Sequence, residues 1–208
     1  FERVLPTLDN NIKSGNSLID FDFYEGQLDF GEVKKVKPFN WKSQFPEIFK
    51  QGGFDAVIGN PPYVRSKLLS EIDRSYFSNK FQSSIGTYDL YSIFIERTYH
   101  LIKQDGLIAF INPNKYFYSD YGAGIRKFIH EKYSIVSIVD FNEFQIFNGI
   151  TTYTAVNIFS KTQNKSTFIY TKLINSKIGQ KDVEGFLLYG LSNDKILSIS
   201  IDKDNLDS

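Results

Sequence analysis

A short apolar run that stops at two prolines leaves this chain few possible folds. The run Phe54-Asp55-Ala56-Val57-Ile58-Gly59 is mostly apolar and does not alternate with polar residues. A strand covered on both faces of a parallel sheet has this pattern. Pro61 and Pro62 follow, and proline cannot continue a strand because it has a fixed φ and no backbone N–H. The sequence therefore predicts a buried strand over residues 54–59.

Segments around this run alternate between helical and strand patterns. Apolar spacing and glycine or proline breaks predict helices at 45–49, 89–103 and 124–132, and strands at 107–111, 135–139 and 153–159. Alternation of this kind is typical of a doubly wound sheet. We therefore expect an α/β fold with helices on both faces of the sheet.

The chain changes character after Lys161. Its 208 residues, of which 41% are hydrophobic, are enough for one domain with a sizeable core. Beyond Lys161, polar residues separate short apolar stretches such as Phe168–Tyr170 and Phe186–Tyr189. We place a boundary near Lys161, and residues 161–208 are either the last strands of the same domain or a spacer leading to another region.

Composition excludes several kinds of site. Lys and Arg number 24, as do Asp and Glu, so no global basic field indicates a nucleic-acid partner, and phosphate contacts would need another region. No cysteine is present, and His100 and His130 are far apart in sequence, so we expect no metal site. No apolar run reaches the roughly 20 residues that span a bilayer, and a cytoplasmic setting fits best.

The four residues after the strand, Asn60-Pro61-Pro62-Tyr63, can carry chemistry. Ligands of open α/β sheets bind outside the carboxyl ends of strands, where this motif falls. The Asn60 side-chain oxygen and the Pro61 carbonyl can each accept one N–H of an amine, which bends the amine lone pair outward toward a methyl donor. Tyr63 can stack on a base. The simpler alternative is a rigid turn, since Asn and Pro are common turn residues.

Residues 53–64 resemble motif IV of DNA adenine-N6 methyltransferases. Further matches follow in the family's order: motif V at Tyr88–Tyr91 with Phe94, motif VI at 106–117, and motif VIII at Phe147 with 154–156. Residues 45–49 are similar to type IIG enzymes, in which the methyltransferase is fused to a nuclease. Residues 1–160 would then be the C-terminal part of the catalytic domain, and 161–208 its last strands or a spacer to a target-recognition region.

The resemblance implies a substrate, a cofactor and further site residues. The substrate would be double-stranded DNA with a flipped adenine, clamped between Tyr63 and a second aromatic residue. Phe147 is the candidate for that residue, with Phe144 as the fallback. The cofactor would be S-adenosylmethionine, held by Asn16 in a motif III match at residues 15–18 and by Phe94. For Asn16 a surface-loop role, and for Phe144, Phe147 and Phe94 a packing role, remain the alternatives.

One expected feature of such an enzyme is missing from the sequence. No glycine-rich motif I loop precedes residue 15, and the chain contains no methionine. We therefore expect the first strands of the sheet to lie before Phe1 in a larger parent chain. The isolated 208 residues should then bind S-adenosylmethionine poorly and be weakly active or inactive.

Three functions remain open at this stage. The first is methylation of adenine N6 in a specific DNA sequence, within a bacterial restriction-modification or phage-defence protein. The second is a protein-glutamine or RNA methyltransferase, since amide and guanine amine nitrogens need the same bending of the lone pair. The third is a non-catalytic DNA-recognition fragment of a larger protein.

Overall fold

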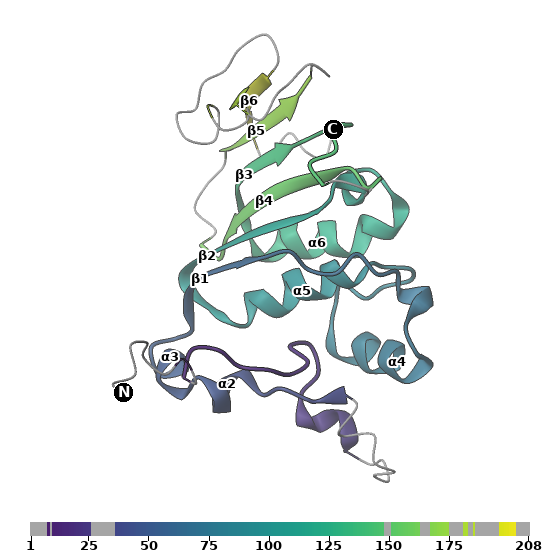
Figure 1. Ribbon diagram of the computed structural model, residues 1–208, viewed down its shortest axis with the longest axis vertical. Coiled ribbons are helices and arrows are strands. Elements are labelled where there is room, and N and C mark those ends of the chain that lie inside the picture. The colour runs from purple at the N-terminus through teal and green to yellow at the C-terminus, as the bar shows by residue number, and fades with distance from the viewer. Residues whose placement is uncertain are drawn as a thin grey trace, which may run out of the picture. The chain divides into compact units, whose positions relative to one another are not determined.

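The computed structural model describes residues 8, 10–25, 36–147, 151–162, 167–174, 181–182, 185 and 196–202. The chain divides into two compact units, Phe1–Gly53 and Phe54–Ser208. The larger second unit contains the sheet and the candidate catalytic motif (Figure 1).

A mixed sheet of six strands forms the second unit. The strands are β1 (Phe54–Gly59), β2 (Ile102–Pro113), β3 (Ser134–Asp140), β4 (Thr154–Ser160), β5 (Thr167–Leu173) and β6 (Ile196–Asp202). Their order across the sheet is β1-β2-β4-β3-β5-β6. β1 runs parallel to β2, and β4 runs antiparallel to both β2 and β3. Therefore β1, β2 and β3 all point the same way, and their carboxyl ends lie along one edge of the sheet.

Strand β1 has the predicted bounds but not the predicted burial. It pairs with β2 and occupies one edge of the described sheet. Val57 packs against the core, whereas Ala56 is exposed and Ile58 is 85% exposed on the opposite face. The expectation that residues 54–59 are buried on both faces is therefore wrong within the described residues, because the core covers only the face that carries Val57.

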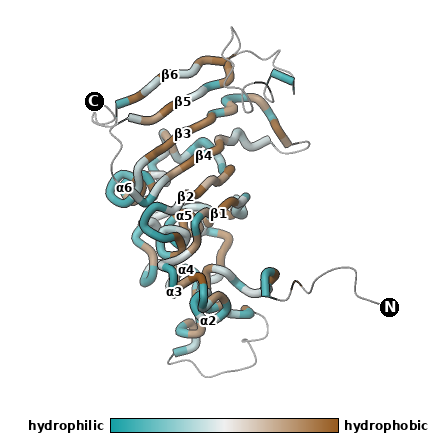
Figure 2. The backbone as a smooth tube through the Cα atoms, turned by 90° about the vertical axis from the view of Figure 1, so that its left-hand side faces the viewer, coloured by the Kyte–Doolittle hydropathy of each residue, from teal (hydrophilic) through white to brown (hydrophobic). Residues whose placement is uncertain are grey.

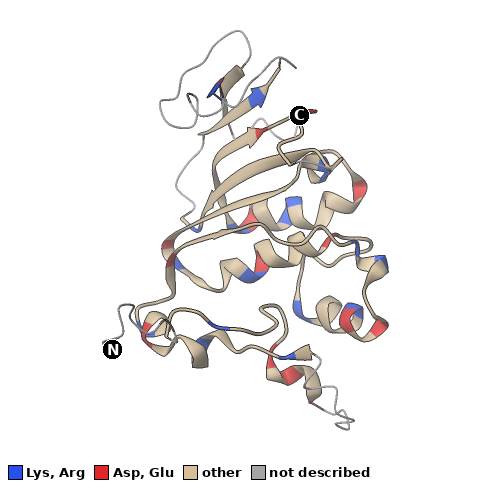
Figure 3. Ribbon diagram, in the orientation of Figure 1, with Lys and Arg blue, Asp and Glu red and all other residues tan. Residues whose placement is uncertain are grey.

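Three helices of about ten residues complete the second unit: α4 (Glu71–Lys80), α5 (Leu90–Tyr99) and α6 (Ala123–Lys132). Helices α5 and α6 lie on the same face of the sheet (Figure 1). Tyr91 and Ile95 of α5, and Ile125 and Phe128 of α6, join one buried cluster with the strand residues beneath them. Figure 2 shows that hydrophobic residues recur along the strands, and Figure 3 shows charged residues mainly on helices and loops.

Helix α5 ends earlier than the sequence pattern suggests. The apolar spacing predicts a helix to residue 103, but α5 stops at Tyr99 and β2 begins at Ile102. Ile102 pairs with Phe54, and the Phe54 N–H donates to the Leu101 carbonyl at 2.9 Å. Pairing with β1 therefore overrides the helical pattern at its last residues. The predicted strand 107–111 lies inside the longer β2.

The other predicted elements are found within one or two residues. Helix α6 covers the predicted 124–132 and β3 covers the predicted 135–139, while β4 lies one residue later than the predicted 153–159. The predicted helical turn at 45–49 is α3 (Pro46–Lys50) in the first unit, and it ends before Gly52 and Gly53, whose φ values are 96° and 123°. A positive φ suits glycine, so these two residues terminate the helix as expected.

The sheet continues beyond Lys161. The apolar stretch Phe168–Tyr170 belongs to β5, which pairs parallel with β3, and β6 pairs antiparallel with β5. Phe186–Tyr189 lies outside the described residues. The division between the two units falls after Gly53. The assignment of residues 161–208 to a spacer or to a recognition region stays a prediction.

The first unit contains short helical segments and an aromatic cluster. Besides α3 it has a 3-10 turn, η1 (Phe21–Tyr24), and α2 (Trp41–Gln44), whose N-terminus is capped by Asn40. Phe39 is buried and packs edge-on against Trp41, with ring centroids 5.0 Å apart. Across the parts of the chain that the structure describes, no helix is long and apolar enough to cross a membrane, and no cluster of three acidic or histidine side chains could hold a metal ion.

Candidate methyltransferase site

The Asn60–Tyr63 motif begins directly after β1, at the carboxyl edge of the sheet. Asn60 and Pro62 are exposed, whereas Pro61 is buried. Gly59 precedes the motif and pairs with Phe110 of β2. A Cβ atom on Gly59 would lie 2.9 Å from the Phe110 ring, so only glycine fits there without a shift. The strand end therefore rests on the Phe110 ring and presents Asn60 to solvent.

Tyr63 is anchored on both β2 and α5. Its hydroxyl donates to the Ile111 carbonyl at 3.2 Å, and its ring packs edge-on against Tyr91 with centroids 6.4 Å apart. Burial raises the pKa of the Tyr63 hydroxyl, which keeps it protonated as a donor. The half-buried ring is thereby held in one orientation beside Pro62.

The residues after Tyr63 are tied to the segment that precedes α5. The Leu90 N–H donates to the Val64 carbonyl at 2.8 Å, and the Ser66 N–H donates to the Tyr88 carbonyl at 2.8 Å. The buried Ser66 hydroxyl also accepts from the Tyr88 N–H at 3.2 Å. The structure thus brings the motif V match next to the motif IV match, although about 25 residues separate them in sequence.

Asp89 lies between these two segments and lines a cleft of about 540 Å³ together with Arg65, Lys67 and Tyr121. Burial raises the pKa of Asp89, and the charges of Arg65 and Lys115 and a hydrogen bond from Tyr91 offset part of that rise. Two of its lining residues, Arg65 and Lys67, follow the Asn60–Tyr63 motif closely in sequence. The cleft carries charges of both signs.

The loop after β3 carries the two aromatic candidates for base stacking. It leaves the same edge of the sheet as the Asn60–Tyr63 motif, because β3 runs parallel to β1. Phe144 packs against a buried cluster that includes Phe141 and Leu173. Phe147 is half-buried and does not belong to that cluster. The Phe144 ring is therefore already engaged in packing, which supports Phe147 as the stacking candidate.

The two cofactor candidates belong to different units. Phe94 of α5 is half-buried and packs against the core cluster beneath the sheet. Asn16, in the first unit, accepts the Leu18 N–H on its side-chain oxygen at 3.2 Å, and its own N–H donates to the Lys37 carbonyl at 2.7 Å. Asn16 therefore holds a fixed turn, with one lone pair of its side-chain oxygen already in use.

Sequence reasoning missed a buried polar network at the carboxyl edge. The Tyr116 hydroxyl donates to Asn157 at 2.8 Å, and the Asn157 amide donates to Asn112 at 3.0 Å. Asn114 and Asp140 form a second pair at 2.9 Å. These five side chains are at most 6% exposed. The available signal was the presence of Asn and Asp inside apolar strand patterns, since a buried polar side chain needs a partner.

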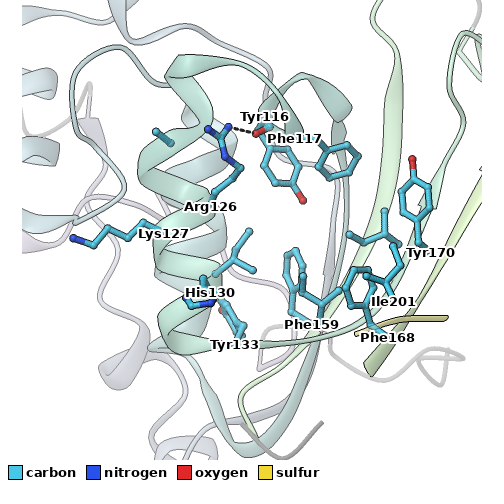
Figure 4. A pocket seen from close by; sticks show the side chains of 14 residues that line it. Tyr116, Phe117, Arg126, Lys127, His130, Tyr133, Phe159, Phe168, Tyr170 and Ile201 are labelled. Carbon is cyan, nitrogen blue, oxygen red and sulfur yellow. Dashed lines mark hydrogen bonds between the residues drawn. The ribbon is translucent and has the colours of Figure 1, made fainter. Parts of the chain in front are cut away.

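A hollow of about 650 Å³ lies between α6 and strands β3 to β6 (Figure 4). Phe117, Phe159 and Phe168 form its apolar wall, while Arg126 and His130 of α6 stand on the opposite side. The Arg126 guanidinium is occupied by the Tyr116 and Ser119 carbonyls, at 2.6 and 2.7 Å. None of the site residues predicted from sequence lines this hollow.

Two curated relatives resemble the chain over most of its length. RM.Eco57I of Escherichia coli, a type II restriction enzyme and methyltransferase, is 29% identical over 84% of this chain and 16% of its own length. The type II methyltransferase M.BstVI of Geobacillus stearothermophilus is 33% identical over 71% of this chain and 26% of its own. The chain therefore spans about a quarter or less of these relatives.

The fold matches a solved methyltransferase, and a family pattern matches the sequence. The methyltransferase subunit of a type I restriction-modification system from Streptococcus thermophilus superposes with a TM-score of 0.59 at 20% identity, over 87% of this chain and 39% of that one. The expected Rossmann-like α/β fold is therefore confirmed, although within the described residues α5 and α6 cover one and the same face of the sheet (Figure 1). The pattern of the Eco57I restriction-modification methylases matches residues 4–147. The chain accordingly belongs to the Eco57I family of restriction-modification methylases.

Proposed function

We propose that this chain is part of the catalytic domain of a DNA methyltransferase that modifies adenine N6 within a specific sequence. The observation that carries this proposal is the Asn60–Tyr63 motif, with exposed Asn60 beside buried Pro61 at the carboxyl end of β1. Membership of a methylase family supports methyl transfer, and the names of the relatives support a restriction-modification setting.

The Asn60–Tyr63 motif can overcome the low nucleophilicity of adenine N6. The N6 lone pair of adenine is delocalised into the purine ring, so the amine is a weak nucleophile. The Asn60 side-chain oxygen and the Pro61 carbonyl each accept one N6 hydrogen, which favours a tetrahedral nitrogen with its lone pair directed outward. With its lone pair so directed, N6 could take the methyl group of a bound sulfonium donor, whose sulfur would keep the electron pair of the broken C–S bond and leave as a neutral thioether, and N6 would then lose one proton to solvent. No covalent enzyme intermediate is needed.

Aromatic residues hold the target base in this proposal. An adenine inside a duplex must leave the stack before an enzyme can reach its amine. Tyr63, fixed by its hydrogen bond to β2 and its ring contact with α5, offers one face for stacking, and Phe147 offers the second. Stacking on an aromatic side chain is worth about 1–3 kcal/mol per base. The base would therefore be held while Asn60 and Pro61 orient its amine.

S-adenosylmethionine is the proposed methyl donor, because it supplies an electrophilic methyl group on a sulfonium sulfur. Asn16 and Phe94 are the residues proposed to bind its adenine ring. The Asn16 oxygen retains a second lone pair that can accept from an amine, and Phe94 is half-buried on α5. Both side chains therefore fit the proposed roles.

We propose that the activity depends on a larger protein. No glycine-rich loop of the motif I kind occurs in these 208 residues, so the isolated chain should be weakly active or inactive. Its proposed partners are double-stranded DNA and the remainder of a larger parent chain. A DNA substrate supports the cytoplasm as its proposed location.

Substrate class is tested with the full-length protein and S-adenosylmethionine labelled in its methyl group. Mixed-sequence duplex DNA, total RNA and protein extract are offered separately, and the products are hydrolysed and identified. The proposal predicts label in N6-methyladenine of DNA. Label only in RNA, or in glutamine side chains, would replace DNA with that substrate, and no label in any of them would favour a non-catalytic recognition fragment.

A further inference from the structure

Asp140 is a buried carboxylate for which the proposed reaction has no direct use. It ends β3 and is 5% exposed. One of its oxygens accepts from the Asn114 side-chain amide at 2.9 Å and from the Asn142 backbone N–H at 2.8 Å. The other accepts from the Tyr170 hydroxyl at 2.7 Å. No lysine, arginine or histidine of the described residues forms an ion pair with it.

The three donors come from three separate segments. Asn114 follows β2, Asn142 lies in the loop that leaves β3, and Tyr170 belongs to β5. A buried carboxylate is costly unless such donors surround it, so these bonds are strongly favoured in the folded protein. The carboxylate therefore ties the loop after β3 to the segment that follows β2 and to β5. Figure 4 shows Tyr170 on β5, with its hydroxyl directed away from Phe168.

The bond to Asn142 fixes how the loop begins. Asn142 has a φ of 52°, a left-handed conformation that costs energy for a residue with a side chain and is tolerated best by Asn and Asp. The Asn142 N–H points back to the Asp140 carboxylate, which makes an Asx turn. The loop from this turn reaches Phe147 only five residues later.

Asn114 also contacts the segment in which the chain returns from this loop to β4. Its backbone N–H donates to the Tyr153 carbonyl at 3.1 Å, directly before β4, while its side chain holds Asp140. The Phe141 N–H in turn donates to the Thr154 carbonyl at 3.1 Å. The end of β3 and the start of β4 are therefore joined to each other and to the loop after β2.

We propose that Asp140 is a positioning residue for the target base, acting through the Asn142 turn and Asn114 to hold the 141–147 loop so that Phe147 faces the base. This inference rests on the proposed function, because the stacking role of Phe147 belongs to it. Asp140 itself touches no reacting atom. Its removal should loosen Phe147 while leaving the donor-binding residues Asn16 and Phe94 unchanged.

The test uses the full-length protein and an unmethylated duplex that contains its recognition sequence. That sequence is first found by mapping where the wild-type protein forms N6-methyladenine in DNA. The target adenine is replaced by 2-aminopurine, whose fluorescence reports the stacking of the flipped base. Asp140→Ala should change this signal and lower kcat/KM for DNA roughly 10- to 100-fold, with the KM for S-adenosylmethionine unchanged. Asp140→Asn should retain most activity, since its amide oxygen still accepts from Asn114 and Asn142 and its NH₂ can donate to Tyr170.

Two further variants separate positioning from simple loss of stability. Asn114→Ala removes one donor, and adding it to Asp140→Ala should lower kcat/KM little further, because both act through the same bond. Tyr133→Phe is the matched control: it removes a buried hydrogen bond to the Ile95 carbonyl, 3.0 Å long, outside this network. It should leave the fluorescence unchanged.

The outcomes distinguish this inference from the proposed function. If the wild-type protein forms no N6-methyladenine, the proposed function fails. If it does, but Asp140→Ala keeps normal fluorescence and kcat/KM, the positioning role is wrong. Loss of S-adenosylmethionine binding in step with DNA binding would also contradict it, since that indicates general unfolding. Should Asp140→Ala not fold, Asn114→Ala decides the same question, because two of the three bonds to Asp140 remain.

Discussion

Gly59 connects packing within the sheet to the placement of the candidate catalytic motif. Its backbone lies against the Phe110 ring, and the next residue is Asn60. A glycine at this point lets the end of β1 approach β2 closely. The position of the Asn60 oxygen is thus set partly by a residue that has no side chain.

Gly59→Ala should therefore destabilise the protein and displace the motif. The added Cβ would meet the Phe110 ring at 2.9 Å, and overpacking of this kind costs about 1–3 kcal/mol. Denaturant unfolding of the full-length protein measures the loss, and methyl transfer should fall with it. Gly59→Ala combined with Phe110→Leu should recover part of both, because the smaller side chain makes room. An equally severe loss in the double variant would contradict the steric explanation.

Asp89 gives a prediction about pH. Burial, partly offset by Arg65, Lys115 and a bond from Tyr91, raises its pKa above 3.8. A carboxyl with a raised pKa holds its proton more tightly in the folded state. Its stabilising contribution is therefore full below 3.8 and is lost as the pH rises through the raised value.

The variant Asp89→Asn removes this titration. Its free energy of unfolding should decline less than that of the wild type as the pH rises from below 3.8 to neutrality, so the difference between the two proteins grows in favour of the variant. Chemical unfolding at a series of pH values measures this difference. A difference that moves in favour of the wild type over the same range would show that Arg65 and Lys115 outweigh burial.

At the scale of elements, α5 organises the segment that leads into it. Glu96 of α5 is 2% exposed, and its two oxygens accept the backbone N–H groups of Gln82 and Ser83 at 2.9 and 2.7 Å. This segment continues to Tyr88, which is bonded to Ser66 after the catalytic motif. The Glu96 carboxylate therefore fixes the start of the segment from Gln82 to Tyr88, whose end is bonded to the chain just after Tyr63.

Glu96→Ala should destabilise the protein by roughly 2–4 kcal/mol, because it leaves the buried N–H of Ser83 and the partly buried N–H of Gln82 without partners. Glu96→Gln should cost less, since its remaining oxygen still accepts one of them. Hydrogen exchange at Gln82 and Ser83 provides the local measurement, and both amides should lose protection in Glu96→Ala. Unchanged protection at these two amides would show that the segment is held by other contacts.

Elements with a strong local signal could be predicted from sequence. Proline after Gly59 and glycine before Phe54 delimited β1, and the helical spacing of residues 124–132 gave α6, because both signals are local. The end of α5 could not be found in this way. Leu101 and Ile102 continue the apolar spacing of the helix, and only pairing of Ile102 with Phe54, 48 residues earlier, makes that segment a strand.

At the scale of the whole molecule, the sequence was enough to locate the Asn60–Tyr63 motif but not the contacts between distant segments that hold the sheet edge around it. An apolar pattern shows which residues avoid water and not which are covered, so the exposed face of β1 at Ile58 was missed. Two partners of Asp140, Asn114 and Tyr170, lie 26 and 30 residues away in other segments, which no local pattern reports. Family resemblance named Phe147 as a candidate but could not show that Phe144 is engaged in core packing.

Asn60 is the residue proposed to orient an adenine amine for methyl transfer. Single-turnover transfer of labelled methyl to DNA by the full-length protein tests this role most directly, comparing Asn60→Ala with Asn79→Ala, a matched exposed asparagine on α4. Asn60→Ala should slow formation of N6-methyladenine by roughly 100-fold or more, as loss of one preorganised hydrogen-bond partner typically does, while Asn79→Ala keeps the wild-type rate. An Asn60→Ala protein that methylates adenine at the wild-type rate would contradict the account.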